Sequence, residues 1–524
     1  MFKFSRSKFV IVVVLVSVLT IPIYEAAYAQ PGSFVTTQTV QVGAAALVKP
    51  CSIQIFSDGT YTYMQGCSTG ALLFNSTLAA NVIDDAIGNL TAGGKLFIKA
   101  GTYTFTTTPI NMGSGNVAAV GTTSVSNIEL FGEGNSTILS AGVNMNGMVI
   151  GVHGGGGWYI HDLQINGNRV SQSASGTGTP QLNGIYLALS NNDVVERCYV
   201  HDNKGVGIAV GGTSERILNN YIANNNANGI ILNSGSDYVI QDNIVNGASD
   251  VGISISGLSS GPVSNVICTE NIVSNINLGI SPWGGGSGIG ITVGDQGYGV
   301  NVTISLNRIY ETTNAIESAP LLSPFYGNDE HVLISGNQIH SASSHGIHAE
   351  STTDLSILGN VIDYVANYGI WTSMITGLSI KDNTITNITF ATGTGIYIGS
   401  SLTEYATVSG NLVIGAYYGI YDYQVAYALI GNNHVEGGQS QIYTSGGNTS
   451  IVRNNLLNAL NYAIKLDTGS DHSSAIGNTI YLAAGNKIGI VVNGLNCVVS
   501  GNTILWCWNY CRCKTAISDT KQVP

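Results

Sequence analysis

Two glutamates and a histidine in the second half of the sequence are suited to acid–base chemistry: Glu317, His348 and Glu350. A pair of carboxyl groups roughly 6.5–9.5 Å apart is the arrangement of inverting glycosidases, and a histidine exchanges protons near neutral pH. The same carboxylates, together with loop oxygens, would also suit calcium. We therefore treat these three residues as candidate catalytic residues, with a calcium site at the same place as an open alternative.

The three residues belong to a longer series that we expect to point outward from a stack of strands. A Gly-Ile phrase recurs along the chain, and if its Ile points inward, the next residue and the one two further on point outward. The outward series contains few aromatic or ionisable residues before residue 317 and many from that residue onward. The candidate substrate-binding residues are Trp283, Trp371, Tyr397, Tyr421, Tyr423, Tyr443, Lys465 and Asp467.

Aromatic side chains on successive strands would lie about 4.8 Å apart, which matches the repeat of an extended sugar chain. Aromatic rings are also common platforms for the apolar faces of sugars. Tyr397 or Tyr421 would be able to give a proton to a leaving oxygen. The alternative is that these rings form a cross-strand ladder that only stabilises the sheet.

Two insertions interrupt the regular spacing beside these residues. Residues 281–286 contain Trp283, and residues 319–331 contain the Phe325-Tyr326 pair. Irregular loops on a rigid scaffold often carry binding sites. The register near Trp283 stays open, because either Gly279-Ile280 or Gly290-Ile291 can be the repeated phrase.

A repeat, mostly of 22 to 24 residues, predicts the elements that position these side chains. Each unit contains a short strand, Asn-x-[Ile/Val/Leu] and then Gly-Ile with period-two alternation, which excludes helical repeats and indicates a β-solenoid. We expect the Asn to adopt the left-handed bend and to stack into a ladder of side-chain amides, with Cys198 as a buried substitute. The expected ladder is Asn220, Asn243, Asn271, Asn307, Asn337, Asn360, Asn383, Asn411, Asn433, Asn455, Asn478 and Asn502.

With this repeat and with its N-terminal motifs, the sequence resembles the right-handed parallel β-helix of the pectate-lyase-like superfamily. Those motifs are residues 82–87, 93–98 and 101–103, followed by residues 128–134 and 160–168. The resemblance implies an all-β fold, a single-stranded right-handed parallel β-helix with a short N-terminal capping helix. It also implies that the Gly-Ile strand lines a polysaccharide groove. Asp84 and Asp85 would be surface residues at the start of the helix, where they compensate its dipole.

The resemblance does not imply a reaction. The Gly-His-Gly and Arg-x-Lys phrases of polygalacturonases and the Asp-Pro-His phrase of mannuronan epimerases are missing from the sequence. No Arg lies on the outward series, which puts the Arg-base mechanism of pectate lyases in doubt.

The eight cysteines fall into three groups. Cys51 and Cys67 flank a predicted hairpin and are expected to form a disulfide. Cys198 and Cys268 are too far apart along the stack to bridge. For the C-terminal group we favour two disulfides over a zinc site. That group is Cys497, Cys507, Cys511 and Cys513.

Composition and the N-terminus indicate where the protein acts. Only 9% of residues are charged and the formal net charge is −12, which argues against nucleic acid or an anionic membrane as a partner. Residues 1–29 read as a signal peptide, so we expect a secreted or cell-surface protein without a later transmembrane segment. The alternative is that this segment stays as an uncleaved membrane anchor. The expected parts are residues 30–80 with the hairpin, the β-helix over 81–505 and a Cys/Trp-rich cap or tail over 506–524.

These observations predict a secreted protein that binds an extracellular polysaccharide along the outward series. Whether it also cleaves or epimerises the polymer, as a lyase, a hydrolase or an epimerase, stays open at this point. The alternative is a non-catalytic adhesion or structural protein of the cell surface or envelope. The oligomeric state is open as well.

Overall fold

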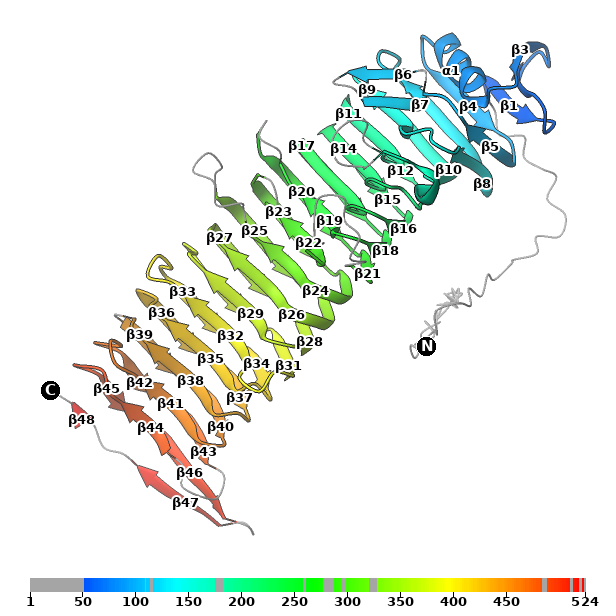
Figure 1. Ribbon diagram of the computed structural model, residues 1–524. Coiled ribbons are helices and arrows are strands. Elements are labelled where there is room, and N and C mark those ends of the chain that lie inside the picture. The colour runs from blue at the N-terminus through cyan, green and yellow to red at the C-terminus, as the bar shows by residue number, and fades with distance from the viewer. Residues whose placement is uncertain are drawn as a thin grey trace, which may run out of the picture. The chain divides into compact units, whose positions relative to one another are not determined.

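The computed structural model describes residues 51–522, apart from 109, 114–115, 175–181, 258–260, 277–286, 295–296, 320–327, 448, 483–487, 509–511 and 518–520. Over this part, the chain forms a single right-handed parallel β-helix, as the sequence predicted. Successive coils follow one another in chain order (Figure 1). The predicted signal peptide lies outside the described residues.

Three parallel sheets run along the stack, and each coil contributes a strand to each of them. The sheet made by the Gly-Ile phrases is called the Gly-Ile sheet here, and the chain passes from it to the second sheet and then to the third. Five long strands turn a corner and belong to two sheets each: β8 (Ile128–Ala141), β10 (Tyr159–Asn166), β17 (Ile230–Gln241), β24 (Arg308–Ser318) and β26 (Gln338–Glu350).

The Gly-Ile sheet consists of β7 (Asn116–Thr122), β9 (Met148–His153), β11 (Ile185–Asn191), β14 (Ile208–Thr213), β17 (Ile230–Gln241), β19 (Val251–Ile255), β22 (Ile289–Val293), β24 (Arg308–Ser318), β26 (Gln338–Glu350), β29 (Tyr368–Ser373), β32 (Thr394–Gly399), β35 (Tyr418–Tyr423), β38 (Ser440–Ser445), β41 (Tyr462–Leu466) and β44 (Ile488–Val492). The second sheet adds β4 (Gly94–Ile98), β8 (Ile128–Ala141), β10 (Tyr159–Asn166), β12 (Val194–Glu196), β15 (Arg216–Leu218), β20 (Val263–Thr269), β23 (Gly299–Ser305), β25 (Asp329–Ser335), β27 (Thr352–Leu358), β30 (Ser379–Lys381), β33 (Ala406–Ser409), β36 (Tyr427–Gly431), β39 (Thr449–Arg453), β42 (Ser474–Ile476) and β45 (Val498–Ser500). The third sheet adds β5 (Gly101–Phe105), β13 (Tyr199–His201), β16 (Tyr221–Asn225), β18 (Ile244–Ala248), β21 (Ile272–Ser274), β28 (Val361–Val365), β31 (Thr384–Ile388), β34 (Leu412–Ile414), β37 (His434–Glu436), β40 (Leu456–Ala459), β43 (Thr479–Leu482) and β46 (Thr503–Trp508).

The isoleucines of the Gly-Ile phrases form an inner row, as predicted. Ile347, Ile370, Ile396 and Ile420 are register partners on successive strands, and none of them is exposed to solvent. Near the C-terminal end, Ile490 keeps the register but is half-buried. Because the edges of each parallel strand pair with neighbouring coils and its inner face packs in the core, the fold depends on stacking for its stability.

The asparagine ladder lies between the second and third sheets. Asn360 donates from its backbone N and from Nδ2 to Oδ1 of Asn383, both at 2.9 Å, and its own Oδ1 accepts the same two bonds from Asn337. Its Nδ2 also donates to the backbone O of Ile334 at 3.0 Å. Every donor of this buried amide is therefore satisfied by the coils on either side.

The left-handed bend lies one residue before the ladder position, not on it. Asp382 has φ +56° and Leu306 has φ +57°, whereas the ladder asparagines that follow them have ordinary backbone geometry. Both of these preceding side chains are exposed. The bend thus falls on a solvent-facing residue, and the Asn keeps the geometry that lets its amide reach the next coil.

Cys198 takes the ladder position in the coil before Asn220. Its backbone N donates to Oδ1 of Asn220 at 3.0 Å, and only 2% of the residue is exposed. Burial raises the pKa of the Cys198 thiol to about 12. Cys198 is therefore a structural, unreactive member of the stack.

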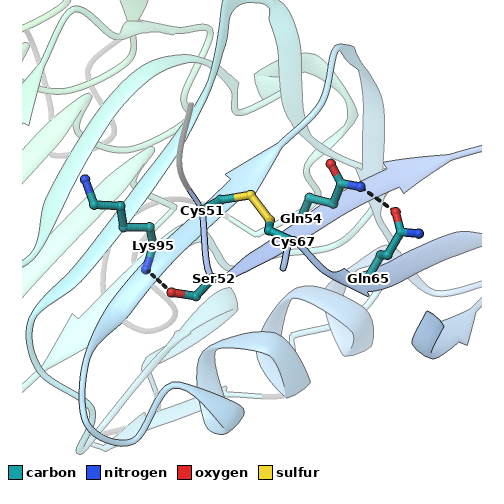
Figure 2. Close-up of a disulfide and its surroundings, with 6 residues drawn as sticks. All are labelled: Cys51, Ser52, Gln54, Gln65, Cys67 and Lys95. Atoms are coloured by element: carbon teal, nitrogen blue, oxygen red, sulfur yellow. Dashed lines mark hydrogen bonds between the residues drawn. A yellow bond between two sulfur atoms is a disulfide. The ribbon is translucent and has the colours of Figure 1, made fainter. Parts of the chain in front are cut away.

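The N-terminal hairpin is joined to the β-helix by strand pairing. β1 (Ile53–Ser57) and β2 (Thr62–Gly66) are antiparallel, β3 (Leu72–Ser76) extends the pair, and β1 is also parallel to β4. Cys51 and Cys67 form a disulfide at the open end of the hairpin (Figure 2). Beside it, Oγ of Ser52 accepts a hydrogen bond from the backbone N of Lys95 at 3.2 Å.

Helix α1 (Ala79–Asn89) buries one apolar side that includes Val82, Ile83, Ala86 and Ile87. Asp84 was expected at the surface at the start of this helix, and that expectation is wrong. The helix begins at Ala79, so Asp84 lies in its second turn, where its carboxylate accepts a bond from the backbone N of Gly121 at 3.1 Å. Burial raises the pKa of Asp84 to about 7.

Two carboxyl groups are buried on the inner side of the second sheet, where later coils carry apolar residues. Asp193 and Glu215 are each 1% exposed, and an Oε atom of Glu215 accepts a bond from the backbone N of Asp193 at 3.1 Å. Burial, and then the negative charge of Asp193, raises the pKa of Glu215 to about 9. Glu215 is therefore protonated at neutral pH.

The C-terminal coil differs from the expectation. β46 crosses the predicted boundary at residue 505 and pairs with β47 (Arg512–Ile517), in which Cys513 is the register partner of Cys507; the short β48 (Lys521–Gln522) pairs with β45. Cys497 is buried without a disulfide, which contradicts the expected two disulfides among the four cysteines, while Cys511 lies outside the described residues. Among the described residues, no helix is long and apolar enough to span a bilayer.

Candidate functional site

The predicted outward row is present in the register of the Gly-Ile sheet. From Thr292 onward, each member is the direct partner of the next on the neighbouring strand. Gly290-Ile291 is thus the repeated phrase near the first insertion. We call the part-exposed members the outward row: Glu317, His348, Trp371, Tyr397, Tyr421, Tyr443 and Lys465.

The N-terminal continuation of this row is covered. Ala209 and Ile231 pack with Val206 and Ala227 in a small apolar cluster that is separate from the main core. Thr292, the last member before Glu317, is 1% exposed. The row is therefore buried from Ala209 to Thr292, and its continuous part-exposed stretch begins at Glu317.

Glu317 and His348 form the start of the outward row. Nδ1 of His348 lies 3.3 Å from Oε2 of Glu317, within ion-pair distance but outside hydrogen-bond geometry. Their side chains are 17% and 19% exposed. The pair is thus sheltered, and a ligand can still reach both groups.

Asn314 connects Glu317 to a second histidine. Its Nδ2 donates to Oε2 of Glu317 at 2.7 Å, and its Oδ1 lies 2.9 Å from Nδ1 of His345. Since an amide oxygen only accepts, this contact requires the proton of His345 to be on Nδ1. Burial, and then the neighbouring His348, lowers the pKa of His345 to about 4, so that its ring is neutral at pH 7.

Glu350 lies two residues beyond His348 on β26 and belongs to a second outward row. Its partner on β29 is Ser373, followed by Gly399 and Tyr423 on the next two strands. No described residue bonds to the Glu350 carboxyl group. The structure therefore places Glu350 on the same face as Glu317, on the adjacent coil, as predicted.

The aromatic rings of the outward row contact one another. The ring centres of Tyr421 and Tyr443 are 4.7 Å apart with planes at 15°, and those of Trp371 and Tyr397 are 5.8 Å apart at 8°. Two parallel rings only 4.7 Å apart cannot lie side by side in one plane, so the faces of Tyr421 and Tyr443 overlap. These two facing ring surfaces are not available as sugar platforms, and this pair offers ring edges and hydroxyl groups instead.

One reason for this arrangement is the room that glycine leaves beside the row. A Cβ atom at Gly399 would lie 2.5 Å from a ring carbon of Tyr397 and 2.6 Å from its hydroxyl oxygen. Tyr397 therefore leans over Gly399. Burial raises the pKa of Tyr397 to about 12, which keeps its phenol protonated.

The far end of the outward row is a closed ionic cluster. Nζ of Lys465 donates to Oδ2 of Asp467 at 2.6 Å and sits 4.6 Å from the ring centre of Tyr443. The Tyr443 hydroxyl also donates to Oδ2 of Asp467 at 2.6 Å, and Nδ2 of Asn493 donates to Oδ1 at 2.9 Å. Partial burial alone would raise the pKa of Asp467, but the bonds from Lys465 and Tyr443 hold it well below its usual range.

Two sequence expectations find no support in the described residues. Trp283, with its insertion, lies outside them. No group of three or more His, Cys, Asp or Glu side chains in the described part of the chain is arranged to hold a metal ion. Calcium at Glu317 and Glu350 therefore stays an expectation from the sequence.

Sequence reasoning missed that the residues before the Gly-Ile phrases form a row of their own. His345 and Tyr368 are register partners whose rings stack at 5.2 Å and 7°, and Tyr418 lies 5.6 Å from Tyr443. These residues, together with Asn314, occur directly before Gly-Ile or Ala-Ile. That position was a readable signal, because it repeats with the same period as the outward row.

Comparison with known proteins gives one family match. The family described as "Right handed beta helix region" matches residues 148–319 and 297–423, which together span more than half of the chain. No curated protein sequence matches this chain.

Several solved structures are similar to this chain. The mannuronan C-5 epimerase AlgE6 A-module of Azotobacter vinelandii is 14% identical, with a TM-score of 0.45 over 81% of this chain and 94% of that chain. The tailspike protein of E. coli bacteriophage HK620, in complex with a pentasaccharide, is 12% identical, with a TM-score of 0.46 over 82% and 76%. The GH87 α-1,3-glucanase of Streptomyces thermodiastaticus is 17% identical, with a TM-score of 0.41 over 81% and 65%. At these values, the likeness says nothing about the reaction or the substrate of this chain.

Proposed function

This chain belongs to the right-handed β-helix family, and from that premise we propose that it binds a polysaccharide along the outward row. One observation carries the proposal. Seven successive strands place part-exposed side chains with hydrogen-bonding groups in a single line, from Glu317 to Lys465. Six strand spacings of about 4.8 Å make this line roughly 29 Å long, which suits a polymer better than a small ligand.

We further propose that the polymer reacts at the Glu317 end. Glu317 is held by Asn314 and flanked by His348, so its carboxylate has a fixed direction. A fixed carboxylate is suited to take a proton from water or to stabilise positive charge on a sugar ring. Among the described residues, none bonds to the Glu350 carboxyl group, so this group can turn toward the leaving oxygen and act as an acid.

The rival proposal is an adhesion or structural protein, and the overlap of the Tyr421 and Tyr443 rings favours it. Rings that stack on one another stabilise a sheet whether or not a ligand binds. A protein of this kind would bind glycans or other partners without turnover.

The test is a binding and product screen of the purified protein. Electrophoresis through gels that contain one soluble polysaccharide each reports binding as retarded migration. Reducing ends and the absorbance of unsaturated products report cleavage in the same samples. Retardation that Trp371→Ala weakens would support the proposal.

The matched control for Trp371 is Tyr427→Ala. Tyr427 is an exposed aromatic residue on β36 of the second sheet, and its ring stacks on Tyr405 at 5.4 Å. It therefore has the same kind of ladder contact on another face. Equal loss of retardation in both variants would place the binding site elsewhere or show a general loss of folding.

A further inference from the structure

We infer that the polysaccharide bound along the outward row is neutral, with hydroxyl groups but without carboxylate, sulfate or phosphate groups. This inference rests on the proposed function and names the class of its substrate. It comes from the charges that the Gly-Ile sheet presents, described in the next paragraphs.

Cations are nearly missing from the face that would contact the polymer. Lys465 is the sole Lys or Arg among the described residues on the Gly-Ile segments from the Glu317 strand onward. Those segments are residues 314–319, 345–350, 368–373, 394–399, 418–423, 440–445, 462–467 and 488–493. A polyanion would need a cation for most of its charged groups to compensate their lost hydration.

The charge of Lys465 is already compensated. Its ammonium group donates to Asp467 at 2.6 Å and lies over the Tyr443 ring. Asp467 is held in place by Tyr443 and Asn493, so turning it away from Lys465 would break two further bonds. The cluster therefore offers an incoming carboxylate no free positive charge.

Apart from the histidines His345 and His348 and the tyrosine phenols, the remaining ionisable groups on this face are acidic. Glu317 and Glu350 add negative charge at the other end of the row, and the whole chain has a formal net charge of −12. Like charges at both the local and the molecular scale oppose the approach of a polyanion. A neutral polymer experiences neither repulsion.

The middle of the row is suited to sugar hydroxyl groups. Burial raises the pKa of Tyr397 to about 12 and also raises that of Tyr421, so both phenols are neutral donors and acceptors across the physiological range. No described residue hydrogen-bonds to either phenol oxygen. These two groups can therefore exchange hydrogen bonds with a neutral sugar without moving a charge.

The test compares soluble neutral polymers, namely a mixed-linkage glucan, a xylan and a galactomannan, with polygalacturonate and alginate. Gel retardation of the full chain is measured at about 20 mM and about 200 mM NaCl, because salt screens charge–charge contacts. We expect at least one neutral polymer to retard the wild type equally at both salt concentrations and neither uronate to do so. Salt-sensitive retardation by a uronate, with none by the neutral polymers, would overturn the inference and leave the proposed function standing. Retardation by no polymer of either class would overturn both.

A second experiment uses a variant in which Lys465 loses its ion-pair partner. Asp467→Asn removes the carboxylate that holds Lys465, and we expect a roughly two- to fivefold gain in uronate binding at low salt that disappears at high salt. Asp382→Asn, at an exposed bend outside the Gly-Ile sheet, is the matched loss of one negative charge and should produce no such gain. An equal gain in both variants would show that net charge, not the closed cluster, excludes polyanions.

Discussion

His348 lies directly beside Glu317 on the neighbouring strand, although the insertion of residues 319–331 separates the two in the sequence. The insertion leaves the register of the Gly-Ile sheet unchanged on both of its sides. The parallel pairing thus makes the two residues neighbours, and Nδ1 of His348 lies 3.3 Å from Oε2 of Glu317.

The first prediction concerns the carboxyl groups. Glu350→Gln should keep polysaccharide binding and abolish product formation, because an amide has the shape of the acid but cannot give up a proton in the same way. The measurement is the reducing-end and unsaturated-product assay beside gel retardation. Full activity of Glu350→Gln would exclude Glu350 as the acid, and an adhesion protein would have no activity to lose.

The second prediction separates ring stacking from hydroxyl contacts. Tyr421→Phe keeps the ring that stacks on Tyr443 and removes only the phenol oxygen, so we expect weaker polysaccharide binding at an unchanged melting temperature. Tyr421→Ala should lower both. If the Phe variant binds like the wild type, Tyr421 serves the sheet and not the ligand.

The third prediction concerns the asparagine ladder. Asn360→Ala removes the oxygen that accepts two bonds from Asn337 and leaves buried donors unpaired, which should cost on the order of 1–3 kcal/mol of unfolding free energy. Asn328→Ala, at an exposed position beside the second insertion, is the control. Equal denaturant midpoints for the two variants would contradict the ladder's role.

The fourth prediction is a pH dependence of stability. The folded-state pKa of Glu215, about 9, is raised above its ordinary value near 4.5, so the folded chain holds this proton more tightly than the unfolded chain. Glu215 therefore stabilises the folded chain fully below about pH 4.5. This part of the unfolding free energy, on the order of a few kcal/mol, is lost as the pH rises toward 9. Asp84, Asp329 and Asp422, whose pKa values burial raises to about 7, act in the same direction.

Calorimetry of Glu215→Gln checks this sign. The amide does not titrate, so the melting temperature of the variant should fall less than that of the wild type between about pH 5 and about pH 9. Glu404→Gln, at an exposed position, should follow the wild type. Parallel curves for all three proteins would mean that Glu215 loses its proton at the same pH in the folded and the unfolded chain, which would contradict the prediction.

The register of the outward row could be predicted from the sequence because each Gly-Ile phrase fixes one strand, and period-two alternation then fixes which side chains share a face. This reasoning placed His348 against Trp371 and Tyr397 against Tyr421. It could not predict that Tyr421 and Tyr443 overlap, because ring orientation depends on side-chain rotamers that the repeat does not determine.

The sequence also did not predict which polar groups are buried. Asp193 and Glu215 stand at positions that are apolar in later coils, such as Leu378 and Ala406, and composition gives no sign that they point inward. Asp84 was misplaced because the start of its helix was expected too late in the chain. In both cases, contacts with distant segments decide the environment of the carboxyl group.

Because the ladder has one Asn per coil, the length of the β-helix can change only by whole coils. Asn360 and Asn383 are 23 residues apart, and each bonds to its successor in the same way. Deleting residues 361–383 would bring Asn360 next to the strand that now follows Asn383, so that the amide stack closes again one coil shorter. The binding face would lose Trp371 and one rung of about 4.8 Å while its two ends stayed intact. Duplicating the same residues would lengthen the face by one strand spacing. On the proposed function, the number of sugar units that fit along the row would then change in whole steps.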